Sequence, residues 1–263
     1  MNILDIKNCT ICYQNGAPAV SDVSLSVSEG EIVSIVGESG SGKTTLIRAV
    51  LGLLPPGGKI TGGEILFDGI DLAKADELQM QDIRGKEIAM IFQDVGAALD
   101  PIQKIRNQYE EAIEVHEKLP RHRYVEKAVE MLKKMHLTDP NRVMNSYPFE
   151  LSGGMKQRVG IAMAMTFNPE LLLADEPTSA LDVTTQAQIV RQMMELRDKS
   201  GTGIIIVTHN LGVAAYMADQ LIVMQNGKVV DQGTRDQVMN HPTNAYTKKL
   251  LAAVPEMGGE RFV

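Results

Sequence analysis

Residues Gly37-Glu38-Ser39-Gly40-Ser41-Gly42-Lys43-Thr44-Thr45 form a glycine-rich segment from which the architecture of the chain can be worked out. The β-branched run Ile32-Val33-Ser34-Ile35-Val36 precedes it, and a helical pattern that ends at Gly52 follows. A strand, a glycine-rich loop and a helix are the context in which the P-loop motif G-x-x-x-x-G-K-[ST] holds nucleotide phosphates. A glycine-rich turn without a ligand is the alternative, and the adjacent Lys43-Thr44 pair argues against it. The segment predicts binding of a nucleoside triphosphate, but not its use.

The residue types of this loop follow from phosphate chemistry. Glycines let the backbone curl so that successive N–H groups point at phosphate oxygens, and the positive end of the following helix adds to the attraction. Lys43 is placed to reach the β- and γ-phosphates, and Thr44 to put its hydroxyl on Mg²⁺. The predicted nucleotide contacts from this loop are Gly37, Ser39, Gly40, Ser41, Gly42, Lys43, Thr44 and Thr45.

The composition indicates one large globular domain, or one domain with an inserted subdomain. The chain has 263 residues, of which 44% are hydrophobic and 22% are charged. Its net charge of −7 argues against broad nucleic-acid binding, which favours a basic surface. There is no apolar run of about eighteen residues, and the N-terminus lacks the apolar segment of a signal peptide. The chain is therefore expected to stay in the cytosol.

The two cysteines, Cys9 and Cys12, have a spacing that can indicate redox or metal chemistry. They lie in a stretch that alternates like a strand, on which residues three apart face opposite sides. No second cysteine pair or neighbouring histidine completes a zinc site. We therefore expect two reduced structural thiols.

Hydrophobic periodicity predicts an α/β fold with a helical insertion. Residues 1–36 have the pattern of short strands, with Asn15-Gly16 as a hairpin turn, and residues 94–150 are polar and mostly helical. Thr61-Gly62-Gly63 predicts a loop. Further strands are expected at 64–69, 88–92, 171–174, 204–207 and 221–224, a hairpin turn at 226–227, and helices at 76–84, 151–168, 183–200, 211–218, 234–239 and 245–253.

Chemically active side chains follow several of these strands. Gln93, the pair Asp175-Glu176, and His209 each come at a strand end, as the P-loop does. In open α/β sheets, ligands bind beyond the carboxyl ends of the strands. Asp175 is suited to hold Mg²⁺ and Glu176 to orient and deprotonate an attacking water. Two solvated acids after a core strand are the alternative, which the upstream P-loop disfavours.

Three single residues have open alternatives. His209 can contact the γ-phosphate or steady the water, or it can be structural. Gln93 can touch Mg²⁺ or water, or simply end its strand. Tyr13 can stack on the base of the nucleotide, although a lone aromatic on a strand more often packs in the core.

A second anion-binding segment is expected at Leu151-Ser152-Gly153-Gly154-Met155, where a helix begins. Ser152 is a suitable N-cap, and the helix start offers exposed N–H groups and a favourable dipole. Because the P-loop already holds the phosphates, this segment makes sense if it serves the ATP of another subunit.

With these motifs in place, the sequence resembles the ATP-binding-cassette (ABC) ATPases of membrane transporters over nearly its full length. Gly37–Thr44 matches Walker A, Leu151–Gln157 the signature motif, Leu171–Glu176 Walker B, and Ser179-Ala180-Leu181-Asp182 the D-loop. Gln93 matches the Q-loop, His209 the switch histidine and Tyr13 the aromatic residue that stacks on adenine.

The resemblance implies a fold in which a P-loop core with a mostly parallel sheet carries an N-terminal antiparallel β subdomain and an inserted α-helical subdomain. A single ABC ATPase domain would then span residues 1–263. The β subdomain and core would take 1–93 and 169–235, the helical subdomain 94–168, and a C-terminal helical tail 236–263.

The resemblance also implies a head-to-tail dimer with ATP between the subunits. Lys43 of one subunit and Ser152 and Gly154 of the other would hold each nucleotide. Mg²⁺ would be held by Thr44, Gln93 and Asp175, and Glu176, His209 and Gln93 would act in hydrolysis. Closure of the dimer would drive two permease subunits, so the chain would lie at the cytoplasmic face of the membrane as a peripheral subunit.

A narrower resemblance is to the oligopeptide, dipeptide and nickel importer branch. It rests on Tyr147-Pro148-Phe149-Glu150, Leu99-Asp100-Pro101, and the C-terminal run from His241-Pro242 through Ala245-Tyr246-Thr247 to Val254-Pro255. Two different ATPase chains commonly pair in that branch, and an extracytoplasmic solute-binding protein supplies the substrate. Many members continue into a cysteine-bearing extension that this chain lacks, so no iron–sulfur site is predicted.

Function is thus expected to be ATP hydrolysis that energises uptake of peptides or of nickel or metal chelates. The alternatives are a soluble ABC ATPase of DNA repair or translation, and the ATPase of an exporter. Long coiled-coil insertions or paired cassettes are typical of the first, and a fused membrane domain of the second. The ATPase sequence does not choose between peptide and metal, or between homodimer and heterodimer.

Overall fold

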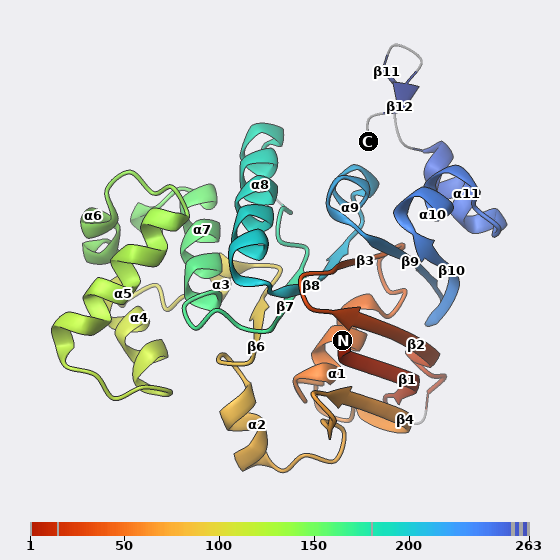
Figure 1. The fold of residues 1–263 in the computed structure, drawn as a ribbon, viewed down its shortest axis with the longest axis horizontal. Coiled ribbons are helices and arrows are strands. Elements are labelled where there is room, and N and C mark those ends of the chain that lie inside the picture. The colour runs from red at the N-terminus through yellow and green to blue at the C-terminus, as the bar shows by residue number, and fades with distance from the viewer. Residues whose placement is uncertain (1, 15, 180, 254–255, 258–259, 262–263) are drawn as a thin grey trace. The chain divides into compact units, whose positions relative to one another are not determined.

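The computed structural model describes residues 2–14, 16–179, 181–253, 256–257 and 260–261. The chain divides into two compact units, one formed by Met1–Gln81 with Gly203–Val263 and the other by Asp82–Thr202. Figure 1 shows the elements of both units along the chain. The predicted turn residue Asn15, the D-loop residue Ala180 and Val254-Pro255 lie outside the described residues.

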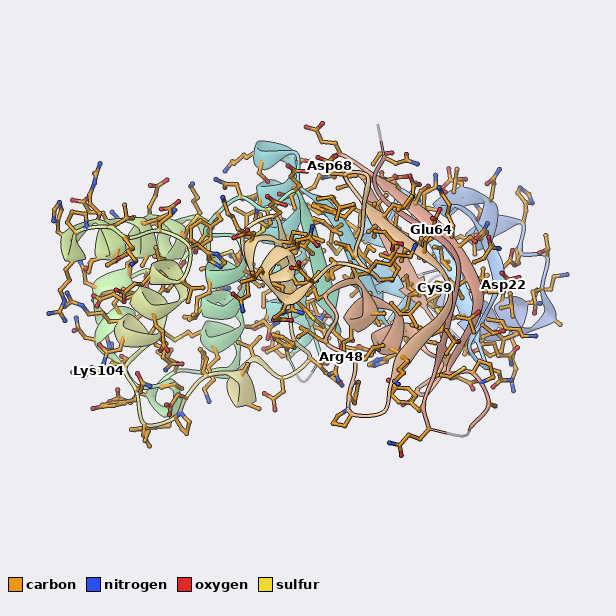
Figure 2. All side chains as sticks on the ribbon, turned by 90° about the horizontal axis from the view of Figure 1, so that it is seen from below. Cys9, Asp22, Arg48, Glu64, Asp68 and Lys104 are labelled. Atoms are coloured by element: carbon orange, nitrogen blue, oxygen red, sulfur yellow. The ribbon has the colours of Figure 1, made fainter. Side chains whose placement is uncertain are left out.

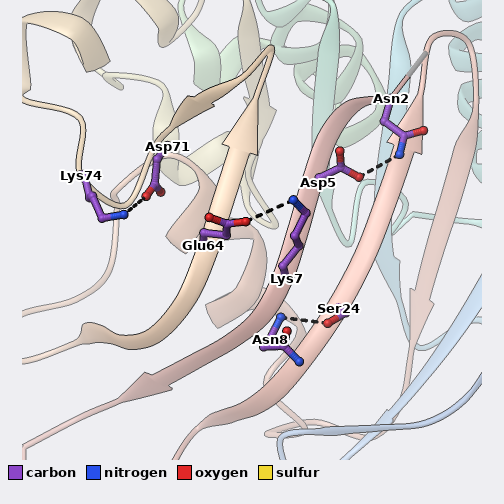
Figure 3. A network of polar contacts seen from close by, with 8 residues as sticks. All are labelled: Asn2, Asp5, Lys7, Asn8, Ser24, Glu64, Asp71 and Lys74. Atoms are coloured by element: carbon purple, nitrogen blue, oxygen red, sulfur yellow. Dashed lines mark hydrogen bonds and ion pairs between the residues drawn. The ribbon is translucent and has the colours of Figure 1, made fainter.

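The first unit contains an antiparallel sheet with the strand order β2-β1-β4-β5. Its strands are β1 (Asn2–Cys12), β2 (Val20–Ser28), β4 (Lys59–Phe67) and β5 (Ile70–Asp71). Leu4, Ile6 and Phe67 are buried on one face. Lys7 of β1 pairs with Glu64 of β4 at 3.1 Å among the exposed polar contacts shown in Figure 3. The alternation of buried and exposed residues is that of a sheet with one solvated face.

Strand β4 corrects one sequence prediction. The loop expected at Thr61-Gly62-Gly63 is part of the strand, which begins at Lys59. Gly63 has a φ of +81°, and a Cβ there would lie 2.3 Å from the carbonyl oxygen of Lys7 on β1. Glycine at this position allows β1 and β4 to approach closely. In the sequence alone, such a glycine resembles a loop residue.

Cys9 lies on β1 (Figure 2). It is buried, and burial raises the pKa of its thiol to about 11. Cys12 is partly buried, with its sulfur 3.5 Å from the hydroxyl of Thr61. Both cysteines are free thiols. A thiol with a raised pKa is a poor nucleophile at neutral pH, so Cys9 is a packing residue.

The first unit also contains the strand that carries the P-loop. Strand β3 (Ile32–Val36) is parallel to β8 (Gly203–Thr208) on one side and to β9 (Gln220–Gln225) on the other. Strand β10 (Lys228–Thr234) pairs antiparallel with β9 through the predicted hairpin at 226–227. Helices α1 (Lys43–Val50), α9 (Leu211–Met217), α10 (Arg235–Asn240) and α11 (Ala245–Ala252) belong to this unit, and the short strands β11 (Glu256–Met257) and β12 (Glu260–Arg261) end it.

The second unit combines two parallel strands with a helical segment. Strands β6 (Ile88–Ile91) and β7 (Leu171–Asp175) pair in parallel. Helix α2 (Glu77–Ile83) precedes β6 in the chain and spans the boundary between the units at Gln81 and Asp82. The predicted helical segment lies wholly inside this unit. The elements of this helical segment are α3 (Val95–Ala98), α4 (Ile105–Glu114), α5 (Arg121–Lys134), α6 (Pro140–Asn145), a 3₁₀ turn (Pro148–Glu150) and α7 (Gly153–Ala164). Helix α8 (Val183–Ser200) follows β7 in the same unit.

The helical elements follow the sequence pattern with one difference in length. Helix α5 buries Tyr124, Ala128, Met131 and Leu132 on one face, as an amphipathic helix does. Helix α7 ends at Ala164, whereas the sequence predicted a helix through Asn168. Asn168 has a φ of +48°, which a helix does not allow. No helix in the described part of the chain has the length and apolarity needed to cross a bilayer.

Candidate nucleotide-binding and hydrolysis site

The loop between β3 and α1 has the backbone of a phosphate cradle. Gly37 and Gly42 have φ angles of +153° and +101°. A Cβ at Gly37 would lie 2.2 Å from the carbonyl oxygen of Met224, and one at Gly42 would lie 2.5 Å from that of Ala19. Both positions therefore require glycine, for conformation and for space.

Lys43 is held inside this loop. Its side chain is buried, and its Nζ donates to the carbonyl oxygens of Gly37 and Glu38 at 2.8 Å each and lies 3.3 Å from the hydroxyl of Ser41. Helix α1 has Gly42 as its N-cap, with no side-chain cap and no acidic residue in its first turn. The loop thus presents an ammonium group beside an uncapped helix start, which favours a bound anion.

Two other predicted residues belong to the same unit. Tyr13 is partly buried, and its hydroxyl lies 3.4 Å from the hydroxyl of Thr45 on α1. His209 is exposed and directly follows β8, whose last residue Thr208 lies opposite Val36 in the parallel register. Gly37 and His209 therefore leave neighbouring strands at the same edge, as the sequence predicted for the chemically active strand ends.

The second unit brings together the Walker B end and the segment after β6. Ile91 of β6 lies opposite Ala174 of β7, so Gln93 and the pair Asp175-Glu176 lie at the carboxyl ends of neighbouring strands. The hydroxyl of Ser179 donates to the carbonyl oxygen of Glu176 at 3.0 Å and lies 3.4 Å from that of Gln93. The hydroxyl of Ser179 therefore links the segment after β6 to the segment after β7.

The two acids at the end of β7 differ in environment. Asp175 is fully buried, whereas Glu176 is partly exposed. Glu176 has a φ of +50°, a left-handed conformation that is uncommon for residues other than glycine, asparagine and aspartate. Such backbone outliers are concentrated at functional sites, where the surrounding structure holds them in place.

The glycine-rich start of α7 is built as the sequence predicted. Ser152 is the N-cap, and its hydroxyl accepts from the N–H of Met155 at 3.3 Å. A Cβ at Gly154 would lie 2.8 Å from Cγ2 of Thr185 on α8. Asp182 caps α8 and accepts from both the N–H and the hydroxyl of Thr185. Gly154 thus allows α7 and α8 to approach closely at their N-termini.

One contact of the P-loop could not be foreseen from spacing. The hydroxyl of Tyr246 on α11 accepts a hydrogen bond from the backbone N–H of Glu38 at 3.0 Å. The sequence placed Tyr246 in a helical C-terminal stretch and in the run that resembles the importer branch, without indicating a contact to the P-loop. A contact across more than two hundred positions has no local sequence signal.

A P-loop on a parallel strand, and a second glycine-rich helix start within a helical segment, are features of an ATP-binding cassette. Residues 20–179 match the ABC transporter family. The chain is 45% identical over 257 residues to a probable peptide ABC transporter ATP-binding protein, y4tR, of Sinorhizobium fredii, covering 97% of this chain and 77% of the relative. It is also 45% identical to the oligopeptide transport ATP-binding protein OppD of Bacillus subtilis, covering 98% and 74%.

Among solved structures, the fold is similar to the dimeric, post-hydrolysis ATP-binding cassette MJ0796 bound to ADP and Pi. The TM-score is 0.78 at 33% identity, and the match covers 88% of this chain and 98% of the other. The chain belongs to the ABC transporter family, and it is one of the ATPases of that family. The predicted fold class and the predicted resemblance to transporter ATPases are both confirmed.

Proposed function

We propose that this chain binds ATP and Mg²⁺ and hydrolyses the nucleotide to energise peptide uptake through two permease subunits. The observation that carries the proposal is the loop Gly37–Thr45, with the ammonium of Lys43 held at 2.8 Å from two loop carbonyls beside an uncapped helix start. The relatives named for peptide transport, with which the match covers nearly the whole chain, support the class of substrate.

Within this proposal, the nucleotide lies on the loop with its phosphates near Lys43 and its base near Tyr13. The donor set assigned to Mg²⁺ consists of Thr44, Gln93 and Asp175, and hydroxyl, amide and carboxylate oxygens are the ligands that this hard cation prefers. Bound Mg²⁺ would neutralise charge on the phosphate oxygens. Glu176 orients and deprotonates the water, and His209 steadies the γ-phosphate side of the site.

In this proposal, the binding site for each ATP is completed by a second ATPase chain. Ser152 is exposed at the start of α7, where it can contact the phosphates of the ATP bound by a partner subunit. Gly154 contributes no side chain to that helix start. The dimeric state of the cassette MJ0796 supports this arrangement. A heterodimer with a second ABC ATPase is the pairing we favour, at the cytoplasmic face of the membrane, with a solute-binding protein acting indirectly from outside.

The test of this proposal uses the transporter complex containing this chain and the variant Glu176→Gln. We expect ATP hydrolysis at the site of this chain to be lost while ATP binding is kept, since the amide cannot accept the proton of the water. Phosphate release and retention of radiolabelled ATP would be measured. Glu130→Gln, on the exposed face of α5 and paired with Lys134 at 2.9 Å, is the matched control and should leave turnover unchanged. Unchanged turnover in Glu176→Gln would contradict the role of Glu176.

The transported substrate is tested separately, by uptake in cells with and without this chain. We expect the cells lacking it to lose uptake of radiolabelled oligopeptides and to keep uptake of ⁶³Ni²⁺. Loss of nickel uptake with peptide uptake intact would overturn the peptide assignment and favour the metal branch. Loss of neither would contradict an importer of these classes.

A further inference from the structure

We infer that Tyr246 is a positioning residue for the phosphate-binding loop, through which the C-terminal helix α11 controls the affinity for nucleotide. This inference rests on the proposed function of the loop. Its basis is the hydrogen bond at 3.0 Å from the N–H of Glu38 to the hydroxyl of Tyr246. Tyr246 does not act on the nucleotide itself in this proposal, because its hydroxyl is bonded to the backbone of the loop.

The hydrogen bond falls on the peptide unit that holds Lys43. The peptide between Gly37 and Glu38 offers its N–H to Tyr246 and its carbonyl oxygen to the Nζ of Lys43 at 2.8 Å. In a trans peptide these two groups point in opposite directions. Tyr246 and Lys43 are therefore bonded to opposite ends of one planar unit, so a rotation of that unit would displace the ammonium group.

The carbonyl of Glu38 is also occupied. It accepts from Lys43 Nζ at 2.8 Å and from the N–H of Ser41 at 3.2 Å. Both peptide units next to Glu38 are thus held by hydrogen bonds within the loop, and Tyr246 adds a hydrogen bond from outside the loop. The hydroxyl of Tyr246 therefore contacts the loop from outside, and the ammonium of Lys43 is bonded to the same loop from inside.

The hydroxyl is itself held by a rigid ring and a fixed helix. The ring of Tyr246 is buried in a core cluster that includes Val36, the last residue of the P-loop strand, and Leu251 of α11. Asn244 caps α11 by accepting from the N–H of Tyr246 at 2.8 Å. Asp231 on β10 accepts from the N–H groups of Thr243 and Asn244 at 3.0 and 3.2 Å.

The decisive variant is Tyr246→Phe, which removes the hydroxyl and keeps the ring. We expect the Kd and the KM for ATP to rise about three- to tenfold, which is the effect of losing one hydrogen bond that orders a binding loop. We expect kcat at saturating ATP to change less than KM, because the bound nucleotide restores the loop. The measurements are equilibrium binding of a fluorescent ATP analogue and steady-state kinetics of the assembled complex.

Two controls separate positioning from general stability. Tyr124→Phe is chemically matched, because the hydroxyl of Tyr124 accepts from the N–H of Leu119 at 2.8 Å in the helical segment, and it should leave the ATP affinity unchanged. Leu132→Ala removes a buried side chain from α5, outside the cluster that holds Tyr246, and should lower the melting temperature, yet leave the KM for ATP within twofold of wild type well below that temperature. An equal rise in KM in either control would overturn the inference.

The outcome can also be separated from failure of the proposed function. Lys43→Ala is measured beside Tyr246→Phe in the same assay. If Lys43→Ala abolishes ATP binding and Tyr246→Phe binds like wild type, the positioning role of Tyr246 is wrong and the nucleotide site stands. If Lys43→Ala also binds like wild type, the assignment of the loop as the nucleotide site is wrong, and the inference falls with it.

Discussion

At the scale of single residues, Gly154 shows how a missing side chain can be a packing requirement. A Cβ at this position would meet Cγ2 of Thr185 at 2.8 Å. Thr185 cannot readily turn away, because its hydroxyl is bonded to the carboxylate of Asp182 at 2.7 Å and its N–H to the same side chain at 3.0 Å. The start of α7, which carries the segment that matches the signature motif, is therefore positioned by α8.

We expect Gly154→Ala to lower both the stability and the ATP turnover of the complex. Forcing a methyl group into this contact should cost about 1–3 kcal/mol and shift the start of α7. The measurements are the free energy of unfolding in urea and the rate of phosphate release. Gly62→Ala is the control, since a Cβ there would lie 3.7 Å from its nearest neighbour. Full activity in Gly154→Ala would show that the helix start tolerates displacement.

At the scale of elements, the sequence predicted those boundaries that are set by local chemistry. The N-cap Ser152 and the left-handed Gly201, with a φ of +72°, bound helices where sequence signals placed them. The Thr61–Gly63 segment was misread, because a glycine that permits close strand contact and a glycine in a loop look alike in sequence. The bond from Glu38 to Tyr246 depends on tertiary packing, which local patterns do not encode.

The anchoring of α11 gives a prediction about pH. Burial disfavours the charged form of Asp231, but hydrogen bonds from Asn244 and Thr243 outweigh it, so the pKa of Asp231 is lowered from 3.8. A carboxyl with a lowered pKa in the folded state stabilises the fold above its unfolded pKa and loses that contribution as the pH falls through its folded pKa. The stabilisation by Asp231 is therefore complete above about pH 5 and declines below pH 3.8.

We expect Asp231→Asn to be less stable than wild type at pH 7, and the difference to shrink as the pH falls below 3.8. The free energy of unfolding of both proteins would be measured from pH 7 to pH 3. Asp68→Asn, at an exposed turn after β4, serves as the control. A difference that stays constant over the whole range would mean that the charge of Asp231 does not hold the start of α11.

At the scale of the whole molecule, the P-loop and the signature helix start belong to different compact units of the chain. Lys43 lies in the first unit, and Ser152 and Gly154 lie in the second. In the proposed dimer these groups serve different nucleotides, so a change at one should leave the other nucleotide in place. This separation makes the head-to-tail arrangement testable without a structure of the complex.

The test uses a complex of this chain with its partner ATPase, in which hydrolysis is blocked so that bound ATP is retained. We expect Lys43→Ala in this chain to remove about half of the retained ATP, because the partner's P-loop still uses Ser152 and Gly154 of this chain. Adding Gly154→Asp to the same chain should remove the rest, since a carboxylate repels phosphate at the remaining site. Filter binding of radiolabelled ATP measures the retained amount per complex. If instead each chain completed its own site, the doubly substituted chain would retain as much ATP as Lys43→Ala alone, and the shared-site arrangement would be wrong.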